Sequence, residues 1–182
     1  MILLILGLLL WSAAHFFKRY APAQRAALGD KGRGFVALGI LAGVIMMILG
    51  YRMAEPTYLW PRAEWATPLN NLVMIFALYL TSPGPNKGAL LHKMRHPMLT
   101  GVALWAAVHL LVNGDLPSLV LFGGLLVWTI ADMIVINRAE PNWTPHPKGS
   151  IAKDAMFFAI SIVLVGVIGY LHTLFGLSPF GG

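Results

Sequence analysis

The stretch RHPMLTGVALWAAVHLLVNGD, residues 95–115, decides the fold class of this chain. It begins at a charged edge, continues as a strongly apolar run over 97–113, and ends in the turn residues NGD. A helix that crosses a bilayer needs about 20 predominantly apolar residues, and about 17 are enough. The run therefore predicts a short membrane helix. His109 lies inside it, where an imidazole finds little water.

The composition of the whole chain indicates an integral membrane protein. Of its 182 residues 58% are hydrophobic and only 11% are charged, with a mean hydropathy of +0.72. The formal net charge of +6 comes from basic residues that lie between apolar runs, so it favours orientation in a lipid bilayer and argues against nucleic-acid binding. There is no cysteine, which excludes disulfides, thiolate metal sites and iron–sulfur clusters.

The apolar runs predict an all-α bundle of about six transmembrane helices, because an open sheet edge does not survive in lipid. Without a repeat or a long linker, residues 1–182 are predicted to form a single transmembrane domain. The predicted spans are 1–17, 34–51, 67–82, 97–113, 117–136 and 155–176.

The Lys and Arg residues predict how the bundle is oriented. Eleven of the thirteen lie in the first, third and fifth connections, and only Arg52 and Arg62 lie in the others. Cytoplasmic connections carry the excess of Lys and Arg, so these three connections are predicted to be cytoplasmic. Both termini are then on the outer, periplasmic side.

Polar residues inside the apolar runs are the candidates for function, because they are costly in a membrane. Each of them can instead form an interhelical hydrogen bond that holds the bundle together. We prefer that interpretation for the two asparagines, and for His109 it stays open beside a ligand role. The set comprises His15, Asn70, Asn71, His109, Asp132 and His172.

Depth in the membrane sorts the histidines into two groups. His96 and His109 are thirteen residues apart on one helix, so they differ by about 20 Å in depth and by about 140° around the axis. They cannot share a metal. Straight helices place His15 near the level of His96 at the inner edge, and His172 near the level of His109 at the outer edge.

Asp132 lies six residues before Arg138, about 9 Å inside the cytoplasmic end of its helix. A hairpin around NGDLP would bring it to the level of Arg95 and His96. We expect an ion pair with one of these two residues. The alternative is a carboxylate that orients a ligand histidine through its second ring nitrogen.

The opening stretch, followed by the apolar run from 116 to 136, resembles the NnrU family of bacterial membrane proteins, which is associated with nitrite and nitric oxide respiration. The first helix, where His15 precedes a basic loop with Ala21 and Pro22, is also similar. The resemblance covers 1–138, and 139–182 adds a loop and a C-terminal helix. It implies a multi-pass protein of the bacterial inner (cytoplasmic) membrane.

A relative of that family, the 15-cis-zeta-carotene isomerase, is a haem b protein. The resemblance implies that His109 is an axial haem ligand and His15 the other, with His96 in the same His-Pro step as a further cofactor-binding residue. Depth leaves His172 as an alternative partner of His109. Redox or isomerase chemistry is implied, or support of nitrogen-oxide respiration, with a hydrophobic small molecule or a respiratory enzyme as partner.

Two other functions stay open. The step RHPMLTG resembles that of membrane methyltransferases that use S-adenosylmethionine, although Leu99 replaces a tyrosine and the segment after the hairpin offers only Glu140. An accessory membrane protein without chemistry of its own is the third possibility, since no nucleophile constellation, phosphate loop or carboxylate pair is present.

Overall fold

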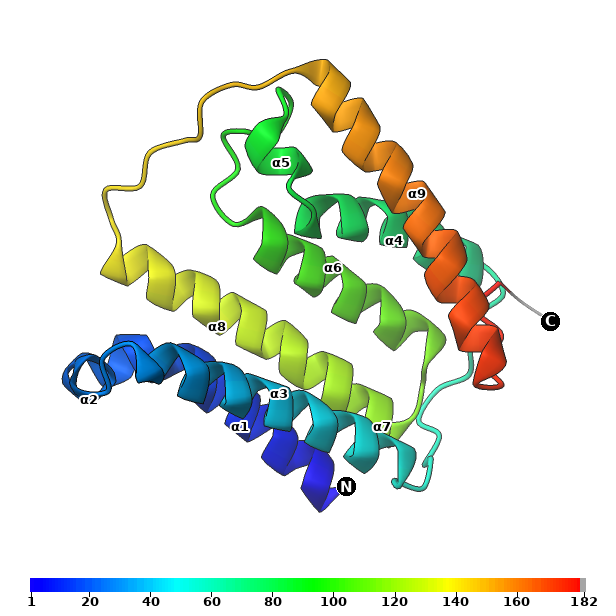
Figure 1. The fold of residues 1–182 in the computed structure, drawn as a ribbon. Helices are drawn as coiled ribbons and strands as arrows, with labels where there is room; N and C mark the ends of the chain where they lie inside the picture. Colours follow the sequence, from blue (N-terminus) through cyan, green and yellow to red (C-terminus); the bar gives the residue numbers. More distant parts are fainter. Residues whose placement is uncertain (181–182) are drawn as a thin grey trace. The chain divides into compact units, whose positions relative to one another are not determined.

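The computed structural model describes residues 1–180, which are all-helical apart from loops, turns and one isolated bridge between Tyr58 and Asp115. The prediction of an all-α fold is confirmed. The helices in chain order (Figure 1) are α1 (Ile2–Tyr20), α2 (Pro22–Ala27), α3 (Lys31–Arg52), α4 (Ala66–Thr81), α5 (Gly84–Lys87), α6 (Pro97–Val112), α7 (Leu116–Ser118), η1 (Leu119–Gly123), α8 (Gly124–Ala139) and α9 (Ile151–Leu174).

Every predicted span corresponds to helix, with shifted ends. α9 begins four residues before the predicted 155, because the Ser150 side chain caps the helix and accepts from the backbone N–H of Lys153. The fifth span is a continuous helix over Leu116–Ala139 that contains one π-type turn, η1, soon after Pro117.

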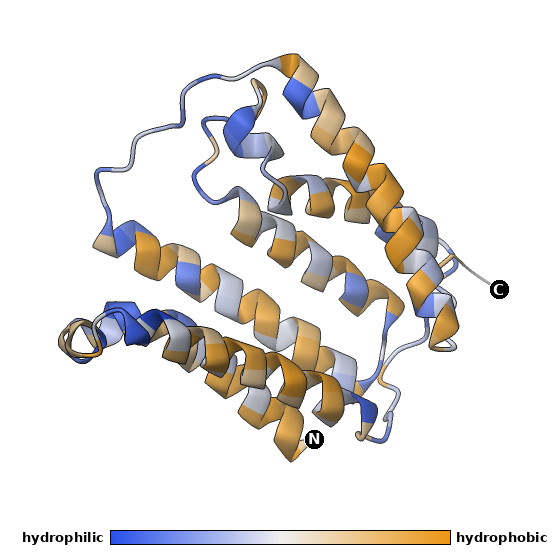
Figure 2. Ribbon diagram, viewed as in Figure 1, coloured by the Kyte–Doolittle hydropathy of each residue, from blue (hydrophilic) through white to orange (hydrophobic). Residues whose placement is uncertain are grey.

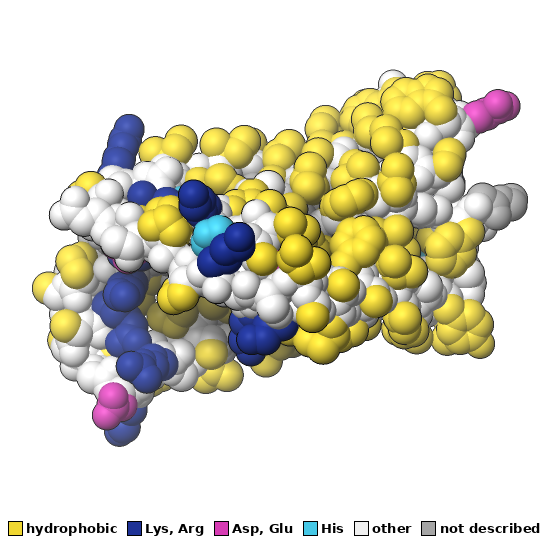
Figure 3. Space-filling model, turned by 90° about the horizontal axis from the view of Figure 1, so that it is seen from above, with side chains coloured by type: hydrophobic (Ala, Val, Ile, Leu, Met, Phe, Trp, Pro, Cys, Tyr) yellow, Lys and Arg dark blue, Asp and Glu magenta, His cyan; other side chains and the backbone are white. Residues whose placement is uncertain are grey.

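Four helices are long and apolar enough to cross a bilayer: α1, α3, the continuous helix Leu116–Ala139, and α9. α4 and α6 are apolar but shorter, with 16 residues each. Figure 2 shows these helices mainly in the hydrophobic colours, and Figure 3 shows a broad surface of hydrophobic side chains. The structure fits a helical membrane protein, while the count of six spans and the outward termini stay predictions.

The chain divides into two compact units. The first unit comprises Met1–Trp60 and Gly114–Ala139, and the second comprises Pro61–Asn113 and the residues from Glu140 onward. In the first unit, α1 and α3 lie side by side (Figure 1). A Cβ atom on Gly7 would lie 2.7 Å from the backbone nitrogen of Met47, and one on Gly50 would collide with the backbone of Leu4. Glycine thus permits the close approach of these two helices.

The C-terminal end of α3 is tied to the start of α7 by a hydrogen-bond chain within the first unit. The Tyr51 hydroxyl and Ser118 Oγ lie 2.8 Å apart, and Ser118 Oγ donates to Asp115 at 2.8 Å. The second carboxylate oxygen of Asp115 accepts from the Ser118 backbone N–H at 2.9 Å. The fully buried Ser118 hydroxyl is therefore satisfied.

In the second unit, α4 packs against both α6 and α9. Gly101 of α6 approaches the backbone of α4 so closely that a Cβ atom would lie 2.6 Å from the carbonyl oxygen of Ala77. On the other flank, the rings of Phe76 and Phe158 are 5.5 Å apart. α4 is therefore the central helix of this unit.

The carboxylate of Asp154 in α9 organises the segment between α4 and α6. It accepts from the Tyr79 hydroxyl at 2.5 Å and from the backbone N–H groups of Ala89 and Leu90 at 2.6 and 3.1 Å. Any side chain on Gly88 would collide with it. Asp154 is only 3% exposed, so this buried carboxylate is matched by three donors.

Candidate functional site

Three histidines in the apolar helices share one side-chain geometry. Nδ1 of His15, His109 and His172 lies 2.9, 2.8 and 2.7 Å from the carbonyl oxygen four residues earlier. A carbonyl oxygen only accepts, so in the neutral imidazole Nδ1 carries the proton and Nε2 the lone pair. The same arrangement orients metal-ligating histidines through their second ring nitrogen.

His109 and His172 both belong to the second unit and lie in the last turns of α6 and α9. Their imidazoles are within range of an electrostatic interaction. Both side chains are half-buried. The structure therefore places these two histidines at the same end of the second unit, as the depth estimate predicts.

Two asparagines lie at the same end of the second unit. α4 runs antiparallel to α6 and α9, since its last turns meet Gly101 and Asp154 near the beginnings of those helices. Asn70 and Asn71, in the first turns of α4, are thus at the end that carries the histidines. Asn70 donates to Asn71 at 3.1 Å, and Asn71 donates to the carbonyl of Pro179 at 3.0 Å. Neither of these two bonds joins two helices, so the interhelical role of the asparagines stays a prediction.

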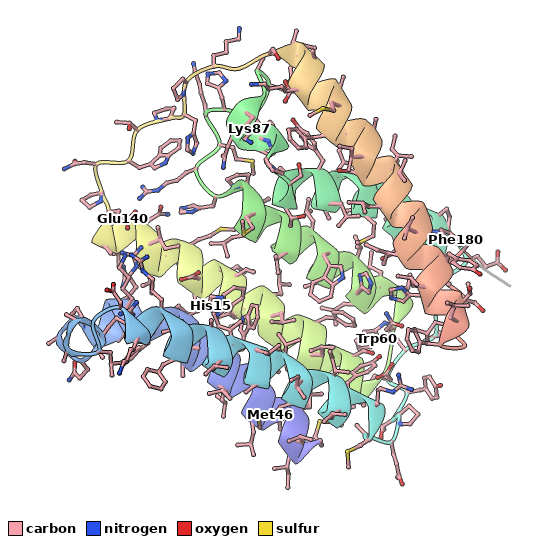
Figure 4. The ribbon with its side chains drawn as sticks, viewed as in Figure 1. His15, Met46, Trp60, Lys87, Glu140 and Phe180 are labelled. Atoms are coloured by element: carbon pink, nitrogen blue, oxygen red, sulfur yellow. The ribbon has the colours of Figure 1, made fainter. Side chains whose placement is uncertain are left out.

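His15 lies in the first unit, beside α8 in Figure 4. Its ring centroid is 4.2 Å from that of Trp11 and 4.7 Å from that of Trp128. Because His15 and His109 belong to different units, their pairing on one iron stays a prediction.

Arg95 and His96 lie at the entrance to α6, as predicted. His96 occupies the N-cap position, and its carbonyl accepts from the Thr100 hydroxyl at 2.9 Å. The Arg95 guanidinium donates to the carbonyl of Glu140 and lies 5.9 Å from the centroid of Trp143. These contacts join the entrance of α6 to the loop that precedes α9.

Asp132 is buried in α8, with 8% of its surface exposed. It belongs to the first unit, whereas Arg95 and His96 belong to the second. The predicted ion pair and the alternative role as an orienting carboxylate both stay predictions.

Sequence reasoning missed two features. Asp154 lies one residue outside the predicted span 155–176, so it was not among the candidate residues. The cap residue Ser150 was the signal that the helix starts earlier. The indoles of Trp11 and Trp128 were not among the candidates, although the spacing of Trp11 and His15 by four residues places both on one helix face.

Within residues 1–180, no group of three His, Asp or Glu side chains is arranged to hold a metal ion. Haem iron needs only one or two protein ligands, because the porphyrin supplies four. Paired imidazoles are therefore a sufficient protein donor set for haem.

The apolar helices, with half-buried histidines in three of them, place the chain in the class of helical membrane proteins. Within that class the chain belongs to the NnrU family, because the model of that family, described as NnrU protein, matches residues 3–179. The match continues beyond the resemblance over 1–138 and includes α9. No curated protein and no solved structure matches the chain significantly.

Proposed function

We propose that this NnrU-family protein is a six-span protein of the bacterial inner membrane, with both termini outside, that binds haem b through His109. The four long apolar helices and the two shorter ones support the membrane part of the proposal. The excess of Lys and Arg in alternate connections supports the orientation.

The side-chain geometry of His109 carries the haem part of the proposal. Its Nδ1–H donates to the carbonyl of Trp105 at 2.8 Å, which fixes the ring and gives Nε2 the lone pair that iron requires. A neutral imidazole is a common axial ligand of haem. The apolar residues of α6 suit the faces of a porphyrin.

His172 is the second ligand that the geometry of the second unit favours. It repeats the ring orientation of His109 and lies within electrostatic range of it. His15 repeats the orientation in the first unit, and it is the partner that the family resemblance implies. Spectra of single variants decide between the two.

Haem, when bound, would supply one-electron chemistry at iron, for a redox or isomerase reaction or in support of nitrogen-oxide respiration. The chain would hold the imidazoles at fixed orientation and exclude water with its apolar helices. A hydrophobic small molecule or a respiratory enzyme would be the partner of such a site.

The experiment is an absorption spectrum of the full chain purified from haem-replete cells. We expect a Soret band and an α band that sharpens on reduction with dithionite. His109→Ala should abolish both bands, whereas His146→Ala, in the exposed loop before α9, should leave them unchanged. A colourless, fully folded wild-type protein would refute haem binding.

The variants His172→Ala and His15→Ala assign the second ligand. Loss of the low-spin spectrum in only one of them, restored by added imidazole, identifies that residue. An unchanged spectrum in both variants would exclude His15 and His172 as the second ligand of the iron.

A further inference from the structure

Three lysines of the second unit lie around one junction, although they come from two segments that are far apart in the sequence. Lys87 ends α5, and Lys148 and Lys153 flank the start of α9. α5 packs against α9 (Figure 1). We call Lys87, Lys148 and Lys153 the lysine cluster.

Two glycines form the contact that brings Lys87 and Lys148 to this junction. The backbone N–H of Gly149 donates to the carbonyl of Gly88 at 2.9 Å. A Cβ atom on Gly149 would collide with the carbonyl of Lys87, so the two segments touch backbone to backbone. Lys87 and Lys148 each precede one of the two bonded glycines and are therefore held near each other.

The third lysine is fixed to the same junction by its neighbour Asp154. The Asp154 carboxylate accepts from the backbone N–H of Ala89 at 2.6 Å, which ties the first turn of α9 to the segment after Lys87. Asp154 is only 3% exposed and is bound by three donors, whereas all three lysines are exposed. The buried carboxylate organises the lysine cluster but does not cover it.

The two segments carry an excess of positive charge. Residues 82–96 contain three Lys or Arg residues and no acid, and residues 140–153 contain two Lys residues and one acid, Glu140. Lysine binds phosphate groups as a point charge on a flexible stem. The charge of the junction therefore fits an anionic ligand.

Two apolar side chains beside the lysine cluster favour a lipid over a soluble anion. Leu90 and Ile151 are each 67% exposed. The backbone N–H of Leu90 donates to Asp154 at 3.1 Å, and Ile151 begins α9, a helix apolar enough to cross a bilayer. Exposed leucine and isoleucine are unfavourable in water and favourable among acyl chains. The surface thus joins positive charge to apolar contact at the end of a membrane helix.

We propose that the lysine cluster binds the headgroup of an anionic phospholipid. Its ammonium groups contact the phosphate, while Leu90 and Ile151 contact the upper part of the acyl chains. Basic residues at the cytoplasmic ends of membrane helices attract such headgroups. The proposal needs only the apolar helices and is independent of haem ligation by His109, so each can fail without the other.

The test is native mass spectrometry of the full chain in detergent. The chain is titrated with dioleoylphosphatidylglycerol and with dioleoylphosphatidylcholine, which has the same acyl chains and no net charge. The wild type should prefer the anionic lipid, and the preference should shrink as the ionic strength rises. Each of Lys87→Gln, Lys148→Gln and Lys153→Gln should bind that lipid about fivefold more weakly.

Two matched variants separate the lysine cluster from net charge. Lys31→Gln removes the same charge from an exposed lysine of the first unit and should bind like the wild type. Lys148→Arg keeps the charge at the junction and should also bind like the wild type.

A variant without any change of charge tests the geometry of the junction. Gly149→Ala should weaken binding of phosphatidylglycerol, because the added methyl group pushes the two segments apart. Gly166→Ala, in α9 with open space around it, is the control and should bind like the wild type. Circular dichroism shows that each variant is folded.

Any of four results would overturn the proposal. Equal affinity of the wild type for the two lipids would leave the lysine cluster to a soluble acidic partner. Equal losses in Lys31→Gln and Lys148→Gln would reduce the effect to net charge, and wild-type affinity in folded Gly149→Ala would show that the junction does not matter. Displacement of the lipid by millimolar inorganic phosphate at constant ionic strength would make this a site for free phosphate.

Discussion

The buried carboxylate of Asp154 offers the sharpest test of how the second unit is held together. Replacement by alanine leaves the Tyr79 hydroxyl and the backbone N–H groups of Ala89 and Leu90 without their acceptor. Tyr79 and Ala89 are 6% and 9% exposed, whereas Leu90 is 67% exposed and can bond water instead. The substitution therefore leaves two buried donors without an acceptor.

The magnitude follows from those two donors. An unsatisfied buried donor costs about 1–3 kcal/mol, so Asp154→Ala should lower the free energy of unfolding by about 2–6 kcal/mol. Tyr79→Phe removes only one hydrogen bond and leaves the carboxylate two donors, so its cost should be about 1 kcal/mol. In the double variant the two losses should not add, because both residues share one contact.

The assay is unfolding of the purified protein in mixed micelles by titration with sodium dodecyl sulfate, followed by circular dichroism. Trypsin cleavage at Lys87 and Lys93 reports the same change locally, since both residues lie in the segment that Asp154 holds. Asp30→Asn is the control, because Asp30 is exposed and its side chain makes no cap hydrogen bond. The reasoning is wrong if Asp154→Ala stays within about 0.5 kcal/mol of the wild type, the range of neutral surface substitutions, and resists trypsin equally well.

Four further substitutions and one titration test other parts of the structure. Gly7→Ala should destabilise the chain by about 1–3 kcal/mol, because the added methyl group overpacks the contact of α1 with α3. Gly34→Ala is the control and should not destabilise the chain, because the space around Gly34 is open. Equal stability of the two variants would contradict the close approach of α1 and α3. The chain has no cysteine, so a single introduced cysteine can be labelled specifically. The predicted orientation requires that Glu55→Cys react with an impermeant maleimide from outside whole cells and that Asn142→Cys react only after lysis. The reverse pattern would show that the orientation is opposite to the predicted one. S-adenosylmethionine binding, which the methyltransferase alternative requires, should be absent in calorimetry at millimolar ligand if the haem proposal holds; saturable binding would favour the alternative.

The sequence predicted the helices well because each apolar run is a local signal. Residues 97–113 and the observed Pro97–Val112 differ by one residue, since the proline and the turn residues NGD bound the run on both sides. The start of α9 was missed because Lys153 and Asp154 look polar in isolation, while the Ser150 cap and the hydrogen bonds to Asp154 make them helical.

The candidate site was less predictable, for a physical reason. Hydropathy shows that His109 and His172 are costly in a membrane, and helix geometry gives their depth, but neither shows which helices are neighbours. The contact of Tyr79 with Asp154 joins residues 75 positions apart, and that of His15 with Trp128 joins two helices. Such contacts depend on packing between distant segments, which no periodic pattern records.

The glycine contact between α1 and α3 also bears on how the protein is made. The contacts at Gly7 and Gly50 involve only residues up to Arg52, so this hairpin needs nothing synthesised later to close. It can form in the membrane before α8, the helix that completes the first unit, has been synthesised. α8 then docks on a surface that already exists, and a substitution at Gly7 would disturb the first unit during biogenesis, before α8 arrives.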